Sequence, residues 1–192
     1  MIPLGILAAA GGAVAAGSYD LLATEILTSS ESSIEFTSLN STYGADYQHL
    51  QIRTVTRDTR SDTGSNILFR VNGVTTSSYA HHRLYADGST VNSYSGVSTT
   101  SIINGVTASA NSTANSFGVS VIDILDPFTT DKNTTVRTLS GTMANATGGN
   151  LLVLGSGLFN STASITSFSI LPTSGSFVTG SRFSLYGLKA SA

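Results

Sequence analysis

The chain has 192 residues, of which only 10% are charged, with a formal net charge of −2 and no cysteine. This length suits one domain with a core of its own. The lack of cysteine excludes disulfides and thiolate metal sites, and the weak net charge provides no basic field for nucleic acid and no polybasic patch for a membrane.

The charged fraction is far below the roughly 25% of an ordinary soluble domain. Hydrophobic residues nevertheless reach 40% of the chain. Together with recurrent β-branched and aromatic runs, they indicate a buried core rather than a disordered chain. A surface covered by hydroxyl groups instead of charges suits a β-sandwich that buries much of its area against neighbouring subunits.

Residues 1–17 form an apolar, small-residue segment that differs from the rest of the chain. A signal peptide is one interpretation, because Ala13-Val14-Ala15 resembles a peptidase site, but no Lys or Arg precedes the apolar stretch. The segment is also too short and glycine-rich to span a bilayer. We interpret it as an assembly arm that becomes ordered against a partner, with an internal strand as a further alternative. The arm residues expected to contact that partner are Ile2, Pro3, Leu4, Ile6, Leu7 and Val14.

From residue 19 onward, short apolar runs alternate with clusters of Ser, Thr, Gly, Asn and Asp, which is typical of all-β architecture. Residues 66–72 alternate most clearly, with Ile67, Phe69 and Val71 expected to point inward. Residues 117–125 are apolar on both faces, which predicts a central strand. The predicted strands are residues 19–27, 33–39, 49–57, 66–72, 79–86, 117–125, 136–139, 151–154, 164–171 and 182–188.

Turn residues separate these runs. Asn72-Gly73 and Asp87-Gly88 are tight-turn dipeptides. Pro127 and Pro172 are expected to close the strands before them, because proline cannot donate to a β-ladder.

About ten strands in one domain predict an all-β, antiparallel two-sheet sandwich, with a jelly roll as the preferred topology. An immunoglobulin-like sandwich is the alternative, although the cysteine pair and tryptophan of its core are missing. The predicted organisation is an N-terminal arm over residues 1–17 and a β-sandwich domain over residues 18–192. Strand order is left open.

No arrangement of residues predicts catalysis, a cofactor or a bound metal. His81 and His82 are neighbours on a predicted strand, so they should point to opposite faces rather than share a metal. Asp123, Asp126 and Asp131 bracket a turn and offer a calcium alternative, but aspartate in such loops usually bonds its own backbone. A Ser-His-Asp hydrolase stays possible only by geometry, since no G-x-S-x-G motif occurs. We therefore predict that the protein is not an enzyme.

Tyrosines near predicted turns are the candidate recognition residues. Aromatic rings stack on sugars, so Tyr79, His82, Tyr85 and Tyr94 could contact a glycan. The other interpretation, which we favour, is that these rings pack between strands or between subunits.

Five segments in fixed order carry a family resemblance. They are residues 49–53 (HLQIR), 69–73 (FRVNG), 79–88 (YAHHRLYADG), 117–125 (FGVSVIDIL) and 180–187 (GSRFSLYG). Together they resemble a group of small virion proteins of tailed bacteriophages, frequent in cyanophages and other aquatic phages, over residues 19–190. The resemblance implies a virion component without enzymatic activity, located on the capsid or on the tail.

The leading hypothesis is a capsid decoration (cement) protein on the outer capsid surface. It would bind as a homotrimer at local three-fold positions, with the arm lying across the major capsid protein. The alternative is a tail-fibre or spike module that joins tail proteins and recognises host surface glycan. A secreted bacterial adhesin is a third interpretation, which rests on the signal-like N-terminus alone.

Overall fold

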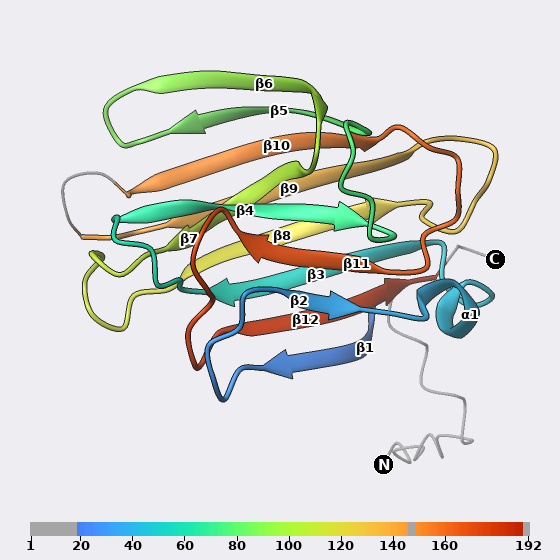
Figure 1. Cartoon of the computed structure of the whole chain (residues 1–192), viewed down its shortest axis with the longest axis horizontal. Helices are drawn as coiled ribbons and strands as arrows, with labels where there is room; N and C mark the ends of the chain where they lie inside the picture. Colours follow the sequence, from blue (N-terminus) through green and yellow to red (C-terminus); the bar gives the residue numbers. More distant parts are fainter. Residues whose placement is uncertain (1–18, 146–148, 190–192) are drawn as a thin grey trace, which may run out of the picture.

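The computed structural model describes residues 19–145 and 149–189, which form two antiparallel sheets packed face to face (Figure 1). The large sheet has eight strands, in the order β1 (Tyr19–Ile26), β12 (Arg182–Leu188), β3 (His49–Thr56), β8 (Gly118–Leu125), β9 (Thr134–Thr142), β10 (Leu151–Phe159), β5 (Tyr79–Ala86) and β6 (Val91–Thr99). The small sheet has four, in the order β2 (Ile34–Phe36), β11 (Phe168–Pro172), β4 (Gly64–Val71) and β7 (Ile102–Ala108). The predicted β-sandwich is confirmed, whereas its jelly-roll topology stays a prediction. The predicted arm, residues 1–17, lies outside the described residues.

The period-two pattern of the sequence sets which side chains enter the core. In β4, Ile67, Phe69 and Val71 are fully buried, as predicted. In β3, Leu50 and Ile52 are fully buried while Arg53 points to the outer face. Successive residues of a strand point to opposite faces, so this alternation fixes the register of each strand relative to the core.

Each sheet contributes a group of paired aromatic rings to the core between the two sheets. Phe168 of β11 lies at the centre, with ring centroids 5.2 Å from Phe36 and 5.3 Å from Phe69. Tyr79 and Phe159 pair at 5.3 Å where β5 meets β10. Each buried aromatic ring removes roughly 150–250 Å² from water, so these pairs dominate the stability of the sandwich.

Strand β7 approaches the large sheet so closely that it uses hydroxyl groups of that sheet. The backbone N–H of Val106 donates to Oγ of Ser140 at 3.0 Å, and the hydroxyls of Ser140 and Ser120 lie 2.7 Å apart. Gly105 has φ +146°, and a Cβ there would lie 2.7 Å from Oγ of Ser120. Buried serines therefore satisfy backbone groups that a purely aliphatic layer would leave without partners.

Arg57 fastens the loop that precedes β8. Its Nη1 donates to the carbonyl oxygens of Thr113 and Ser116, both at 2.9 Å. Its Nη2 donates to the carbonyl oxygens of Ala110 and Ser112, at 3.0 and 3.1 Å. One guanidinium thus organises the backbone of residues 110–116 through its planar set of donors.

The predicted turn at Asn72-Gly73 and the strand ends predicted at Pro127 and Pro172 are confirmed. Asn72 and Gly73 both have positive φ, and β8 ends at Leu125, before Asp126 and Pro127. Pro172 is the last residue of β11, where it pairs with Ile67 of β4 beyond the end of the pairing with β2. Its missing N–H therefore costs no hydrogen bond to β2.

Three elements were not predicted. Strand β6 is rich in Ser and Asn, and β7 is broken by glycine, so neither shows a continuous apolar run. Helix α1 (Leu39–Tyr43) is a single short turn that follows β2, which is itself shorter than predicted. Within the described ranges, no helix is long and apolar enough to cross a membrane.

Substituting Phe168 by alanine should lower the free energy of unfolding by about 3–5 kcal/mol, because the cavity would lie between both neighbouring rings of the core. Urea denaturation followed by circular dichroism measures this change. Val97→Ala is the control, because Val97 is 79% exposed and surface substitutions change stability by no more than about 0.5 kcal/mol. A loss below about 1 kcal/mol for Phe168→Ala would contradict its central place in the core.

Candidate functional site

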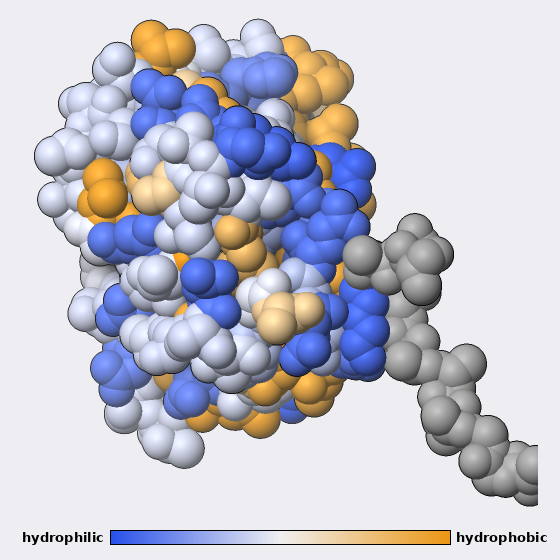
Figure 2. All heavy atoms as spheres, turned by 90° about the vertical axis from the view of Figure 1, so that its right-hand side faces the viewer, coloured by the Kyte–Doolittle hydropathy of each residue, from blue (hydrophilic) through white to orange (hydrophobic). Residues whose placement is uncertain are grey.

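The outer face of the large sheet carries a band of exposed aliphatic side chains, here called the apolar band. Its members lie on β3, β5, β8, β9 and β10 or directly after β9, and they are 42% to 69% exposed. They are Val55, Leu84, Val119, Leu139, Met143, Leu152 and Leu154. The end of the sandwich seen in Figure 2 is mostly hydrophilic or intermediate, with hydrophobic residues along the upper right margin, along the lower edge and at a few places on the left and top. Scattered exposed aliphatic residues are normal, but a contiguous group marks a contact surface.

Strand pairing makes the band contiguous. Leu139 of β9 pairs with Val121 of β8 on one side and with Leu154 of β10 on the other, and Leu154 pairs with Leu84 of β5. These residues form one row across four strands. Paired residues on one face have Cβ atoms only about 4.5–5.5 Å apart, so the row presents continuous apolar surface.

A second row runs beside the first and contains a hollow. Here Gly141 of β9 lies between Val119 of β8 and Leu152 of β10, and Leu152 pairs with Ala86 of β5. A depression of about 550 Å³ lies at this point, with Gly141, Val119, Leu152 and Met143 among the residues that line it. The band is therefore not flat: a row of leucine side chains lies next to the depression at Gly141, here called the socket.

Polar residues border the band and neutralise one another. Nε2 of Gln51 donates to Asp123 at 2.7 Å, and the guanidinium of Arg137 pairs with the same carboxylate at 2.7 Å. Arg53 lies beneath two aromatic rings, 4.8 Å from the ring centroid of Tyr186 and 5.6 Å from that of Tyr19. Charge near the band is thus masked by pairing and by cation–π contact.

The four residues predicted to contact glycan are not brought together. Tyr79 is only 1% exposed, and its hydroxyl accepts from the N–H of Val71 at 2.9 Å and donates to the carbonyl of Val74 at 2.9 Å. Placing Tyr79 on a glycan surface is therefore wrong, because its hydroxyl satisfies buried backbone groups. Burial also raises the pKa of Tyr79. His82 is exposed on the outer face of β5, away from the other rings.

Tyr85 and Tyr94 do lie together, on the inner side of the β5–β6 hairpin. Their rings flank Arg83, whose guanidinium carbon is 5.1 Å from the centroid of Tyr85 and 5.4 Å from that of Tyr94. Nη1 of Arg83 also donates to the side-chain oxygen of Asn66 at 2.6 Å. His81 stacks on Tyr94 with centroids 5.8 Å apart, and burial lowers the pKa of His81, with a further contribution from Arg83.

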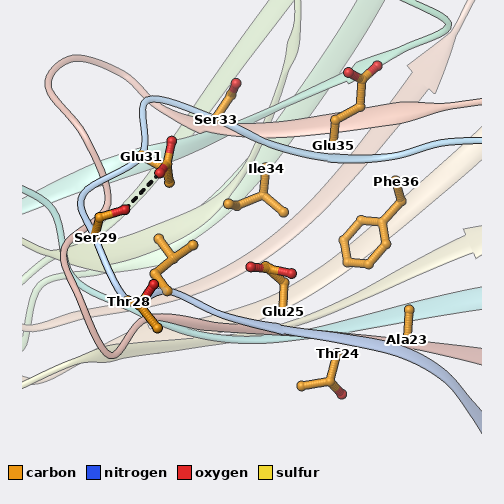
Figure 3. Close-up of a pocket in the computed structure, with 11 residues that line it drawn as sticks. Ala23, Thr24, Glu25, Thr28, Ser29, Glu31, Ser33, Ile34, Glu35 and Phe36 are labelled. Carbon is orange, nitrogen blue, oxygen red and sulfur yellow. Dashed lines mark hydrogen bonds between the residues drawn. The ribbon is translucent and has the colours of Figure 1, made fainter.

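The open side of the sandwich, between edge strands β1 and β2, holds a groove of about 400 Å³. Figure 3 shows the side chain of Glu25 pointing toward Ile34, while Glu35 points away from the groove. Oγ of Ser29 donates to the carboxylate of Glu31 at 3.0 Å. The carboxylates here do not converge on one point.

Two of the three aspartates considered for calcium, Asp123 and Asp126, are paired with protein donors. Asp123 belongs to the border described above, whereas Asp126 accepts from Lys132 at 2.7 Å and from Gln48 at 3.1 Å. The hydrogen bond from Lys132 lowers the pKa of Asp126, with smaller contributions from Gln48 and His49. In the part of the chain that the structure describes, no group of three or more His, Asp or Glu residues is placed to hold a metal ion.

Comparison with known proteins adds no relationship: no protein-family model matches the sequence, and no curated protein matches it. The arm residues Ile2, Pro3, Leu4, Ile6, Leu7 and Val14 lie outside the described residues, so their predicted contact with a partner stays a prediction.

Sequence reasoning missed the apolar band, although a signal for it was present. The segment 117–125 is apolar on both faces, which predicted a central strand. The structure confirms that β8 is central, but Val119 on its outer face is 53% exposed. Strand β10 shows the same pattern, with Leu152 and Leu154 pointing outward. A strand that is apolar on both faces can thus indicate an exposed apolar surface as well as a buried strand.

Substituting Tyr79 by phenylalanine should lower the free energy of unfolding by about 1–3 kcal/mol, since the buried N–H of Val71 would lose its acceptor. The denaturant midpoint measures this change. Tyr94→Phe, at a ring that is 47% exposed, is the matched control, and its effect should stay within about 0.5 kcal/mol. Equal effects of both substitutions would contradict a structural role for the Tyr79 hydroxyl.

Proposed function

We propose that this protein is a structural component of a phage virion that decorates the outer surface of the capsid. The observation that carries the proposal is the apolar band, an aliphatic face that the chain's own small sheet leaves uncovered. The resemblance of five ordered segments to small virion proteins of tailed phages supports the phage setting. In this role many repeated contacts between subunits, rather than one active site, perform the function.

The energetics favour an assembly role for this face. Apolar surface removed from water contributes about 25 cal/mol per Å², so every 100 Å² buried contributes about 2.5 kcal/mol before the entropy cost of association. The neighbouring charged groups already pair with one another, as Arg137 does with Asp123. Covering the band would therefore leave few charges without partners, which keeps the desolvation cost low.

The contact with the capsid is assigned to the arm, residues 1–17, which precede β1 at the edge of the large sheet. The arm has no charged side chain. A short apolar arm adds useful affinity when its contact is repeated across a shell, because linked sites bind with high effective concentration. The homotrimer and the jelly-roll topology expected from the sequence stay predictions.

The copy number per virion tests the proposal. In virions of the phage that encodes this chain, quantitative mass spectrometry should find hundreds of copies, in a simple ratio to the major capsid protein. The major capsid protein, whose copy number follows from the size of the shell, is the internal standard. A few to a few dozen copies would place the protein on the tail or at a vertex, and its absence from virions would refute the proposal.

A tail-fibre or spike module that binds host glycan is the second candidate function. The observation that favours it is the pair of tyrosines flanking Arg83, of which Tyr94 is 47% exposed. Aromatic rings with a neighbouring cationic donor are suited to stacking on sugars and bonding their hydroxyls.

The two functions predict different results for Tyr94→Ala. If the protein decorates the capsid, phage carrying this substitution should adsorb to the host at the wild-type rate, because the ring plays no part in infection. Adsorption of phage to host cells is the measurement, and a folded variant protein in the virions is the control. Loss of adsorption with normal incorporation would favour the receptor-binding function.

A further inference from the structure

Gly141 lies on an exposed sheet face, yet nothing within the described chain requires glycine there. Its φ is not among the positive values found at the turn glycines. A Cβ at Gly141 would lie 3.5 Å from the carbonyl oxygen of Leu151 and 3.9 Å from Cδ1 of Leu152, which are ordinary contact distances. Glycine inside a strand loses packing, and it often marks a place where another molecule approaches the backbone closely.

On two of the four strands that carry both rows, β9 and β5, a large residue in one row stands next to a small residue in the other. Leu139 and Gly141 lie on the same face of β9, two residues apart. On β5 the same two rows contain Leu84 and Ala86.

We propose that the apolar band is the contact surface between two copies of this chain, related by a two-fold axis that crosses β9 between Leu139 and Gly141. The axis lies between the two facing sheets and runs across their strands. It places Leu139 of each copy over Gly141 of the other, and the same rotation places Leu84 over Ala86. On β10 and β8 it places Leu154 over Leu152 and Val121 over Val119, so the side chains of these strands would interdigitate. A two-fold contact joins one surface patch to itself, so a large-and-small pattern on one strand is what such a contact requires.

The size and charge of the band suit a second copy. Its seven side chains, each 42% to 69% exposed, offer on the order of 600 Å² of surface per copy, which matches the largest patch of a typical monomer and approaches the roughly 800 Å² per partner of a stable interface. Two sheets pack face to face at about 10 Å, with side chains of both interdigitating. The two copies would bring no unpaired carboxylate from Asp123 together, because Arg137 and Gln51 already bind it.

This inference rests on the proposed function, whose assembly surface it assigns to a second copy. The two can fail separately, because the mass of the purified full-length protein is measured without capsids, whereas decoration is judged from copy number in virions. The two-fold pair takes the place of the homotrimer expected from the sequence. A trimer would use a heterologous contact between two different patches and would give a different mass.

Sedimentation equilibrium of the full chain at micromolar concentrations tests the pairing. The wild-type protein should show the mass of two chains. Gly141→Leu fills the socket and should weaken dimerisation by roughly 10- to 100-fold, since overpacking costs about 1–3 kcal/mol. Leu139→Ala removes the side chain that fills the socket and should weaken it by about tenfold or more.

The double variant Leu139→Ala/Gly141→Leu provides the decisive result. It exchanges the large and small positions on β9, so the two-fold axis again places leucine over a small residue, and affinity should return to within about tenfold of wild type. Ser169→Leu, on the outer face of the small sheet, adds the same side chain elsewhere and should leave the dimer unchanged. Near-ultraviolet circular dichroism checks that every variant is folded.

Several outcomes would overturn the inference. They are a wild-type monomer throughout, a wild-type mass of three chains, a dimer insensitive to Gly141→Leu, and a double variant as weak as the single ones. If Gly141→Leu fails to fold, Leu139→Asp takes its place, because Leu139 is 56% exposed and tolerates a polar side chain in the monomer. A dimer unaffected by that charge would equally refute the contact.

Discussion

The packing of a four-stranded sheet onto an eight-stranded one is the constraint on which the rest of the structure depends. Phe168 and its neighbours Phe36 and Phe69 form the aromatic inner face of the small sheet. The hydroxyl of Tyr79 in the large sheet accepts from the backbone N–H of Val71 in the small one. The small sheet covers one face of the large sheet, and the β5–β6 hairpin extends past it (Figure 1). No layer formed by residues 19–145 or 149–189 lies on the opposite face of the large sheet. Both candidate surfaces exist because the four-stranded sheet covers only part of the eight-stranded one. The apolar band and the tyrosines around Arg83 both lie on parts of the large sheet that the small sheet does not cover.

The scarcity of charge has a physical consequence for these surfaces. The few charged groups near the band are held by partners, as Asp123 is by Arg137 and Arg53 is by the rings of Tyr186 and Tyr19. The face therefore presents aliphatic side chains with a neutralised border, which can be removed from water at low electrostatic cost. Hydroxyl side chains also act in the interior, where Oγ of Ser140 accepts a hydrogen bond from the backbone of β7. The composition thus serves both the close approach of the layers and the low charge of the surface.

The candidate site was predictable only in part. The sequence left two roles open for the tyrosines, glycan contact and packing between strands or subunits, with packing favoured. Tyr79 is buried against the backbone of Val71, a contact that no local pattern reveals. Tyr85 and Tyr94 both flank Arg83 because the register between β5 and β6 places Arg83 directly opposite Tyr94. The apolar band brings together residues from five strands far apart in the chain. In the sequence, the band is visible only as strands that are apolar on both faces. A strand buried on both sides shows the same pattern.

Period-two alternation and turn residues were enough to predict an all-β sandwich, the inward residues of β3 and β4, and the ends of β8 and β11. These properties are local, because alternation and the constraints of glycine and proline act within a few residues of the chain. Strand order, the pairing of Leu139 with Leu154, and the bare outer face were decided only by tertiary structure. They depend on which strands neighbour one another and on how far one sheet covers the other. An apolar residue carries the same sequence signal whether this chain or another molecule covers it, and only the folded arrangement distinguishes the two.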